Sequence, residues 1–209
     1  KIPTGHPYHR AWLHIRIMDA RMRMLFESGA VDITGAMRGV PDGYSPNLDL
    51  ITRLEEVQIY QSVMADAQGK STWLLLRGAT YLKDNRLPPR GFKISGSDTA
   101  NVAVRGGAEL DSNFNAQSSG RDEVTYQIVL PESQGTLSVE VELVYQSVPP
   151  EAVARLLKAR EPAAQAFAKL YRGQNNQPEL IQRQRLEFRP AGRLRAGNEN
   201  DRPQLVNAR

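Results

Sequence analysis

The chain has 209 residues, of which 40% are hydrophobic and 24% are charged, and its formal net charge is +4. These proportions suit a globular protein with one large domain, or one medium domain with appendages, and they exclude a wholly disordered chain. No stretch approaches the roughly 18 consecutive apolar residues of a membrane span. The absence of cysteine excludes disulfides, Cys-ligated metals and covalent CxxCH haem attachment within this chain.

The positive charge is concentrated at the end of the chain. Residues 183–209 carry seven arginines against three acidic residues, and this excess equals the whole net charge. The remaining chain is neutral and shows no aromatic and basic surface on which bases would stack, so we expect no nucleic-acid partner. The basic tail is either a solvated arm or a segment that binds an acidic surface.

Period-two alternation of apolar and polar residues predicts strands over most of residues 11–148. The first two runs should form a hairpin, and a short helix competes with the strand assignment at 72–81. The strands are expected at about 11–18, 21–28, 55–63, 71–76, 101–104, 123–130 and 137–148. About seven short strands separated by turn residues predict a mainly β fold, an antiparallel, immunoglobulin-like β-sandwich.

The periodicity changes at Pro149-Pro150. Apolar residues then recur at helical spacing, and Pro162 suits the first position of a helix, so we expect two short helices, at about 150–160 and 162–172. The segment 173–209 has few apolar residues and is predicted to be an extended polar tail, apart from a turn of helix near 178–185. The predicted organisation is an opening segment (1–10), a sandwich domain (11–148), a helical segment (149–172) and a tail (173–209).

Six sequence blocks follow one another in a distinctive order: KIPTGHPYHRAWLHI, VQIYQSVM, LLRGATYLKDNRLPPRGF, VAVRGGAELD, DEVTYQIVLP and VELVYQSVPPEAV. In order and spacing, over about residues 1–172, this set resembles the C-terminal β-rich domain of bacterial multihaem c-type cytochromes. The Arg-Gly step followed by YLKDNRLPPRGF is the most specific part of the resemblance.

The resemblance implies that residues 1–10 are a junction between the sandwich and a haem-bearing segment. Because this chain has no CxxCH, the haem c would be carried by another segment or chain. The implied function is a non-catalytic domain of a periplasmic or extracellular electron-transfer protein, which shields or docks the haem-bearing segment or cytochrome subunit. Association with further copies of the chain is left open.

All three histidines lie among the first fourteen residues. Imidazole is a good axial ligand of haem iron, and His6 and His9 fall in a segment stiffened by Pro7. We therefore take His6, and as second choice His9, as candidate axial ligands of a haem carried elsewhere. The alternative is that both are ordinary surface or hydrogen-bonded histidines, and His14, within a strand, is expected to be structural.

Two arginines flank the Pro-Pro loop of the third block. Arg86 and Arg90 are candidates for docking the haem domain or for pairing with a haem propionate, because a guanidinium binds a carboxylate through two hydrogen bonds. The alternative is a rigid turn in which Asp84 and Asn85 bond local backbone.

The remaining motifs predict neither a metal site nor a catalytic site. The segment 111–122 opens like a calcium loop, but Ala116 stands where the loop needs glycine, so a polar connection is expected. No Ser-His-Asp arrangement, GxSxG elbow or suitable carboxylate pair is present, and we expect no enzyme. A second function hypothesis is an exported module that binds a carbohydrate or protein partner through loops carrying aromatic residues: Tyr8, Trp12, Tyr44 and Trp73.

Overall fold

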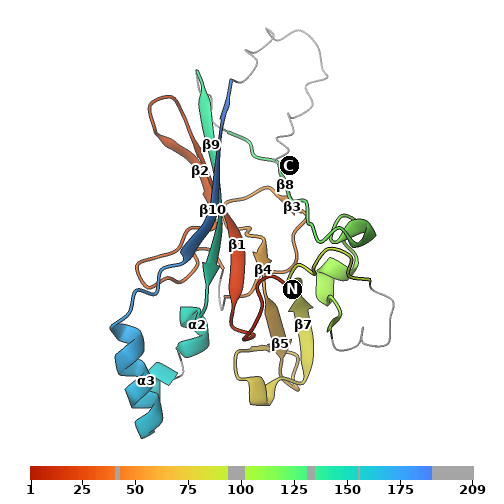
Figure 1. Ribbon diagram of the computed structural model, residues 1–209. Coiled ribbons are helices and arrows are strands. Elements are labelled where there is room, and N and C mark those ends of the chain that lie inside the picture. Colours follow the sequence, from red (N-terminus) through yellow and green to blue (C-terminus); the bar gives the residue numbers. More distant parts are fainter. Residues whose placement is uncertain (41–42, 94–101, 131–134, 155, 190–209) are drawn as a thin grey trace.

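A computed structural model describes residues 1–40, 43–93, 102–130, 135–154 and 156–189. The described chain is mainly β, with antiparallel sheets and few helices, in a sandwich-like arrangement (Figure 1). Its strands are β1 (Arg10–Met18), β2 (Met24–Ser28), β3 (Leu50–Ile51), β4 (Ile59–Tyr60), β5 (Ser62–Ala65), β6 (Ser71–Thr72), β7 (Thr80–Asp84), β8 (Thr125–Tyr126), β9 (Leu137–Gln146) and β10 (Glu179–Phe188).

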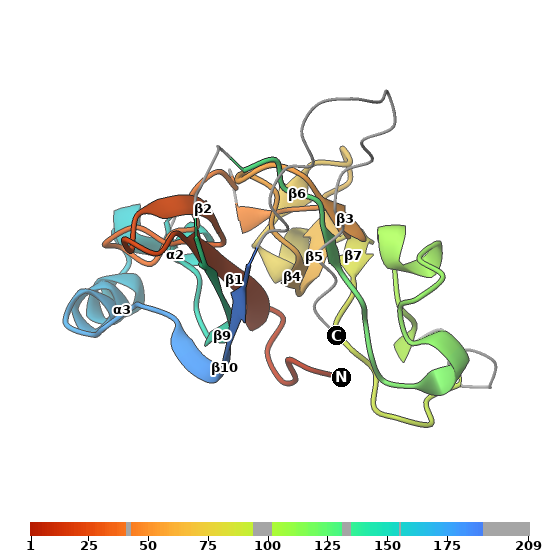
Figure 2. The same cartoon turned by 90° about the horizontal axis from the view of Figure 1, so that it is seen from above.

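The main sheet has the order β10-β9-β1-β2, and β4 also pairs with β1. β1 lies at its centre and pairs antiparallel with β9 along its whole length, from Arg10 opposite Gln146 to Met18 opposite Ser138. A second sheet has the order β6-β5-β7, and β3 and β8 form a short parallel pair. Seen from above, β3 and β8 lie on one side of the main sheet and the helical segment on the other (Figure 2).

Successive side chains of β1 and β9 point to opposite faces of the main sheet and pack in different core clusters. Alternate residues of both strands join β2, β3 and β8 in one core cluster, which contains Ile15, Ile17, Phe26, Ile51, Val124, Tyr126 and Val139. The opposite face contributes to a second cluster of Trp12, Met37, Val40, Val57, Ile59 and Val144. A third cluster, of Tyr60, Val104, Ala108 and Phe114, lies under the loops that follow β7. One face of the main sheet is therefore packed along β1 and β9, as in a sandwich, whereas the other is packed at Trp12 and Val144 and carries charged residues beyond them.

The helical segment is shorter at its start than expected. A first helix, α2 (Pro150–Val153), is followed by a 3-10 turn, η5 (Leu156–Lys158), and then by α3 (Pro162–Arg172), which has proline in its first turn. α3 lies at the end of the molecule away from the sheet centre (Figure 1), and Ala168 is its one buried residue. No helix in the described ranges is long and apolar enough to cross a membrane.

The prediction for the tail was wrong at residues 179–188. The segment forms β10, not a turn of helix, and pairs antiparallel with β9 from Glu179 to Phe188. All ten residues of β10 are exposed, so its composition resembles a solvated arm while its backbone completes the edge of the sheet. Of residues 190–209, which complete the predicted tail, nothing is described.

Other differences concern short elements. The competing helix at 72–81 is wrong, because the segment contains β6, the 3-10 turn η2 (Leu75–Arg77) and the start of β7. The expected strand at 101–104 is replaced by an isolated bridge between Asp84 and Arg105, and residue 101 lies outside the described residues. Two further 3-10 turns, η3 (Gly106–Glu109) and η4 (Ala116–Ser118), shape the long connection between β7 and β8.

Candidate functional site

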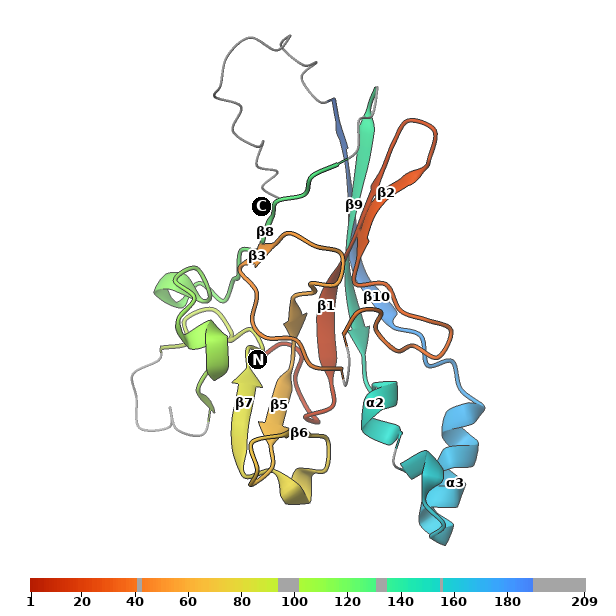
Figure 3. The same cartoon turned by 180° about the vertical axis from the view of Figure 1, so that it is seen from behind.

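The opening segment is fastened to the loop that follows β7, close to the N-terminus (Figure 3). The amide of Ile2 donates to the carbonyl of Leu87 at 2.7 Å, and the amide of Leu87 donates to the carbonyl of Ile2 at 2.9 Å. Lys1 Nζ donates to Asp84 Oδ2 at 2.9 Å and to the Ala103 carbonyl at 2.7 Å. The KIPTG and KDNRLPP blocks, which are distant in sequence, therefore form one structural unit.

Arg86 belongs to this unit rather than to the outer surface. Its Nε and Nη2 donate to Asp84 Oδ1 and Oδ2 at 2.8 and 2.7 Å, a two-pronged ion pair. Although burial alone would raise the pKa of Asp84, hydrogen bonds from Arg86 and Lys1 hold that pKa below its usual value. The guanidinium of Arg86 is thus engaged by a neighbour two residues away. Arg90 is exposed and forms no ion pair with the described residues.

The two residues that flank Asp84 in the sequence, Lys83 and Asn85, are buried and bond to other parts of the fold. Lys83 is 1% exposed and its Nζ donates to the carbonyls of Ser45 and Pro46 at 2.8 and 3.2 Å. Burial lowers the pKa of Lys83 to about 7. Asn85 Oδ1 accepts from the amide of Gln61 at 3.0 Å. A buried lysine and asparagine inside a charged run gave no sequence signal, because such residues are usually exposed.

The segment that opens like a calcium loop is a polar connection, as expected. Asp122 Oδ2 accepts from the hydroxyl of Tyr60 at 2.8 Å and from Gln58 Nε2 at 3.1 Å. Asp111 Oδ2 accepts from Asn47 Nδ2 at 2.9 Å. These carboxylates serve the protein's own hydrogen bonds, and burial raises the pKa of Asp122. Among the residues that the structure describes, no group of three His, Cys, Asp or Glu side chains could hold a metal ion.

His6 and His9 lie together on the turn that leads into β1. The amide of His9 donates to the carbonyl of His6 at 3.0 Å, and the centres of the two rings are 6.3 Å apart. His9 Nδ1 lies 2.6 Å from the Thr4 carbonyl oxygen, and the amide of Tyr8 donates to His6 Nδ1 at 3.2 Å. His6 is exposed and His9 is half-buried. The two candidate ligands are therefore brought together, each with one ring nitrogen engaged by the backbone.

Aromatic rings pack against this turn on both sides. Tyr8 packs edge-to-face on Trp73, with ring centres 5.9 Å apart, and its hydroxyl donates to the Trp73 carbonyl at 2.6 Å. His9 packs edge-to-face on Tyr145 of β9, with ring centres 5.6 Å apart. The opening segment is thus held in place by ring contacts to β9 as well as by backbone bonds to the loop after β7.

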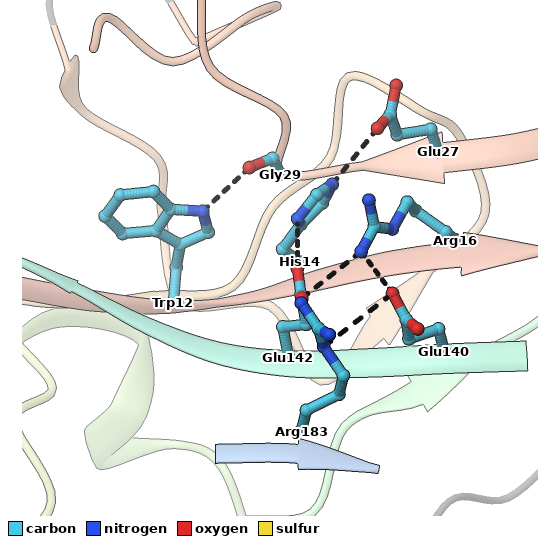
Figure 4. Close-up of polar contacts among 8 residues, drawn as sticks. All are labelled: Trp12, His14, Arg16, Glu27, Gly29, Glu140, Glu142 and Arg183. Atoms are coloured by element: carbon cyan, nitrogen blue, oxygen red, sulfur yellow. Dashed lines mark hydrogen bonds and ion pairs between the residues drawn. The ribbon is translucent and has the colours of Figure 1, made fainter. Parts of the chain in front are cut away.

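His14 lies apart from the other two histidines, in a charged cluster on the main sheet (Figure 4). Its Nδ1 lies 2.9 Å from Glu142 Oε2 on β9, and its Nε2 lies 3.1 Å from Glu27 Oε1 on β2. Carboxylates from the two strands that flank β1 therefore occupy both ring nitrogens. This arrangement fits the structural role expected of His14.

Glu142 is the centre of that cluster. Arg183 Nε of β10 donates to Glu142 Oε1 at 2.7 Å, and Arg16 Nη2 lies 3.2 Å from the same oxygen and also bonds Glu140 (Figure 4). Burial alone would raise the pKa of Glu142, but hydrogen bonds from Arg183 and His14 and the charge of Arg16 hold that pKa below its usual value. The opposite charges compensate one another and fasten β10 to the sheet.

The burial of aromatic residues and the hollows on the surface bear on the second function hypothesis, a module that binds a carbohydrate or protein through aromatic loops. Trp12 is fully buried, and its indole N–H donates to the Gly29 carbonyl at 2.8 Å. Trp73 and Glu151 line a hollow of about 340 Å³, which also includes Lys70 and Thr72. Of the four aromatic residues, Tyr8 and Trp73 come together near this hollow.

Comparisons with known proteins give one weak likeness. The chain matches no family model, and no curated protein matches it in sequence. Its fold is similar to a penta-haem cytochrome c552 from Thermochromatium tepidum, with a TM-score of 0.43 and 15% sequence identity. The alignment covers 90% of this chain and 32% of that cytochrome, so the chain spans about a third of that protein's length.

Proposed function

We propose that the chain is a non-catalytic β-sandwich domain of a multihaem c-type electron-transfer protein, located in the periplasm or outside the cell. The proposal rests on the sequence resemblance and is supported by one structural observation. The two most distinctive blocks, KIPTG and KDNRLPP, are bonded to each other through Ile2 and Leu87. This unit carries His6 and His9 at the surface, where a haem-bearing segment or subunit would dock.

The residues of this surface fit a haem as neighbours rather than as a covalent attachment. His9 has a ring nitrogen, Nε2, that forms no hydrogen bond with the described residues and is not among their buried atoms. A haem iron gains and loses single electrons, and an imidazole nitrogen is a suitable axial ligand for it. The exposed Arg90 is free to pair with a carboxylate of the partner.

The test uses the polypeptide or complex that carries the haems. Replacing both histidines, His6→Ala with His9→Ala, is expected to convert one haem from six-coordinate low spin to high spin in its absorption spectrum. His14→Ala is the matched control, because His14 is held by Glu27 and Glu142 away from this surface. An unchanged spectrum in the double variant would remove the ligand role, and failure of the 209-residue chain to co-purify with any haem-bearing partner would remove the docking role.

The alternative, an exported binding module, is supported only by the hollow beside Trp73. A carbohydrate there would change the fluorescence of Trp73, and Trp73→Phe would abolish the change. The fully buried Trp12 provides the internal reference signal. A sugar-dependent change in the unmodified chain, lost in Trp73→Phe, would favour the binding module over the cytochrome domain.

A further inference from the structure

The two neighbouring histidines differ in which ring nitrogen carries the proton. A carbonyl oxygen can only accept a hydrogen bond, so the 2.6 Å contact between His9 Nδ1 and the Thr4 carbonyl requires a proton on Nδ1. In neutral His9 the lone pair therefore lies on Nε2, which forms no hydrogen bond with the described residues and is not among their buried atoms.

His6 has the opposite arrangement. The amide of Tyr8 donates to His6 Nδ1 at 3.2 Å, so that nitrogen must supply a lone pair and cannot carry a proton. Neutral His6 therefore carries its proton on Nε2. To bind a metal through Nε2, His6 would have to move that proton to Nδ1 and break its bond to the Tyr8 amide.

From these contacts we infer that His9, through Nε2, is the residue of this chain that ligates a haem iron of the partner, and that His6 is not. This inference rests on the proposed function and reverses the order of preference that the sequence suggested. Metal-binding histidines usually donate their second ring N–H to a carbonyl or carboxylate, which fixes the ring and the proton position. The Thr4 carbonyl does this for His9.

Gly5 and Tyr145 act as positioning residues for His9. Gly5 has φ +85°, which favours glycine, and a Cβ at this position would lie 3.1 Å from His9 Cε1 and 3.2 Å from Nδ1, so an added side chain would press on the ring from the turn below it. On the other side, Tyr145 meets the His9 ring at an interplanar angle of 77°. The backbone turn and the tyrosine together restrict the ring to the orientation that its bond to Thr4 requires.

The first experiment needs no haem. In the 209-residue chain at alkaline pH, ¹⁵N chemical shifts distinguish protonated from unprotonated ring nitrogens. We expect His9 to be protonated on Nδ1 and His6 on Nε2. Finding both protonated on Nε2 would overturn the inference whether or not the chain docks on a cytochrome.

The second experiment uses a haem c peptide with one histidine ligand and an open sixth position as the probe. The unmodified chain and His6→Ala should both shift its Soret band to the low-spin position, whereas His9→Ala should not. Gly5→Ala should weaken binding on the order of tenfold, as loss of an orienting partner does at metal sites. Tyr145→Phe, which keeps the ring, should bind as the unmodified chain does, and Tyr145→Leu should bind more weakly.

The outcomes separate the two proposals. Loss of the low-spin shift in His6→Ala but not in His9→Ala would overturn the assignment to His9 and leave the haem-docking function standing. No shift with any variant, together with the expected proton positions, would overturn ligation and count against the proposed function itself. An unchanged affinity for the haem c peptide in Tyr145→Leu and Gly5→Ala would overturn their positioning roles.

Discussion

Replacing Lys83 by methionine should change how the stability of the fold depends on pH. The pKa of Lys83 is lowered by burial from its usual 10.5 to about 7. Between these two values the unfolded chain binds more protons than the folded chain, so the free energy of unfolding rises as pH rises across this window. The slope from a fully buried lysine is on the order of 1 kcal/mol per pH unit.

Lys83→Met removes this slope and also a hydrogen-bond donor. The buried carbonyl of Ser45 loses its 2.8 Å partner, which costs about 1–3 kcal/mol. The variant should therefore be clearly less stable than the unmodified chain at pH 9, and the difference should shrink towards pH 6, where the unmodified chain bears the cost of a buried charge.

Urea unfolding at intervals from pH 6 to 9.5 measures both effects. Comparing the two proteins at each pH cancels the contribution of Lys1, whose pKa burial also lowers. The upper limit avoids the region where Tyr60 and Tyr126, whose pKa values burial raises, would make stability fall as the unfolded tyrosines ionise. Parallel curves for the two proteins would refute the claim that Lys83 is buried in a state that favours its neutral form.

Three further predictions concern stability. Trp12→Ala empties a fully buried position in the second core cluster and should cost about 3–5 kcal/mol, measured by urea unfolding, whereas a cost below 1 kcal/mol would mean that the cluster repacks. Ending the chain at residue 178 removes β10, none of whose side chains is buried, so the fold should persist. The exposed edge of β9 should promote self-association, seen by analytical ultracentrifugation; a monomeric, unchanged profile would contradict this. The pKa of Glu56 is lowered to about 2, first by the Thr52 amide and also by Arg53, so the free energy of unfolding should fall as pH drops from 4.5 towards 2. Glu56→Gln should reduce that loss in urea unfolding. Equal acid sensitivity of the two proteins would contradict the stabilising role of the Glu56 carboxylate.

The sequence predicted those elements in which buried apolar and exposed polar side chains recur at the spacing of a strand or a helix. β1, β2 and β9 carry a period-two pattern because one of their faces packs on a core, and α3 begins and ends as predicted because Pro162 and Gly173 mark its ends. β10 was missed for the opposite reason. It buries no side chain, and it is held by the free backbone groups of β9 and by the ion pairs of Arg183, neither of which gives its sequence an apolar alternation.

The candidate site was predictable only in outline. The position of the histidines near a junction follows from the sequence, but the proton positions of His6 and His9 depend on the Tyr8 amide and the Thr4 carbonyl, whose directions are set by the folded turn. Arg86 was a candidate for docking or for pairing with a haem propionate, yet Asp84 holds it in the unit that also binds Lys1.

The pairing of β1 with β9 has a consequence for biosynthesis. Arg10 emerges from the ribosome 136 residues before its partner Gln146, so the central strand of the main sheet is completed long before its principal neighbour exists. β2 can pair with one edge of β1 soon after it is made, but the edge that faces β9 must stay unpaired while the intervening chain is made, and contacts of such long sequence separation form slowly. The domain should therefore acquire its structure only after nearly all of it has been synthesised, and until then it should depend on chaperones to keep β1 from aggregating.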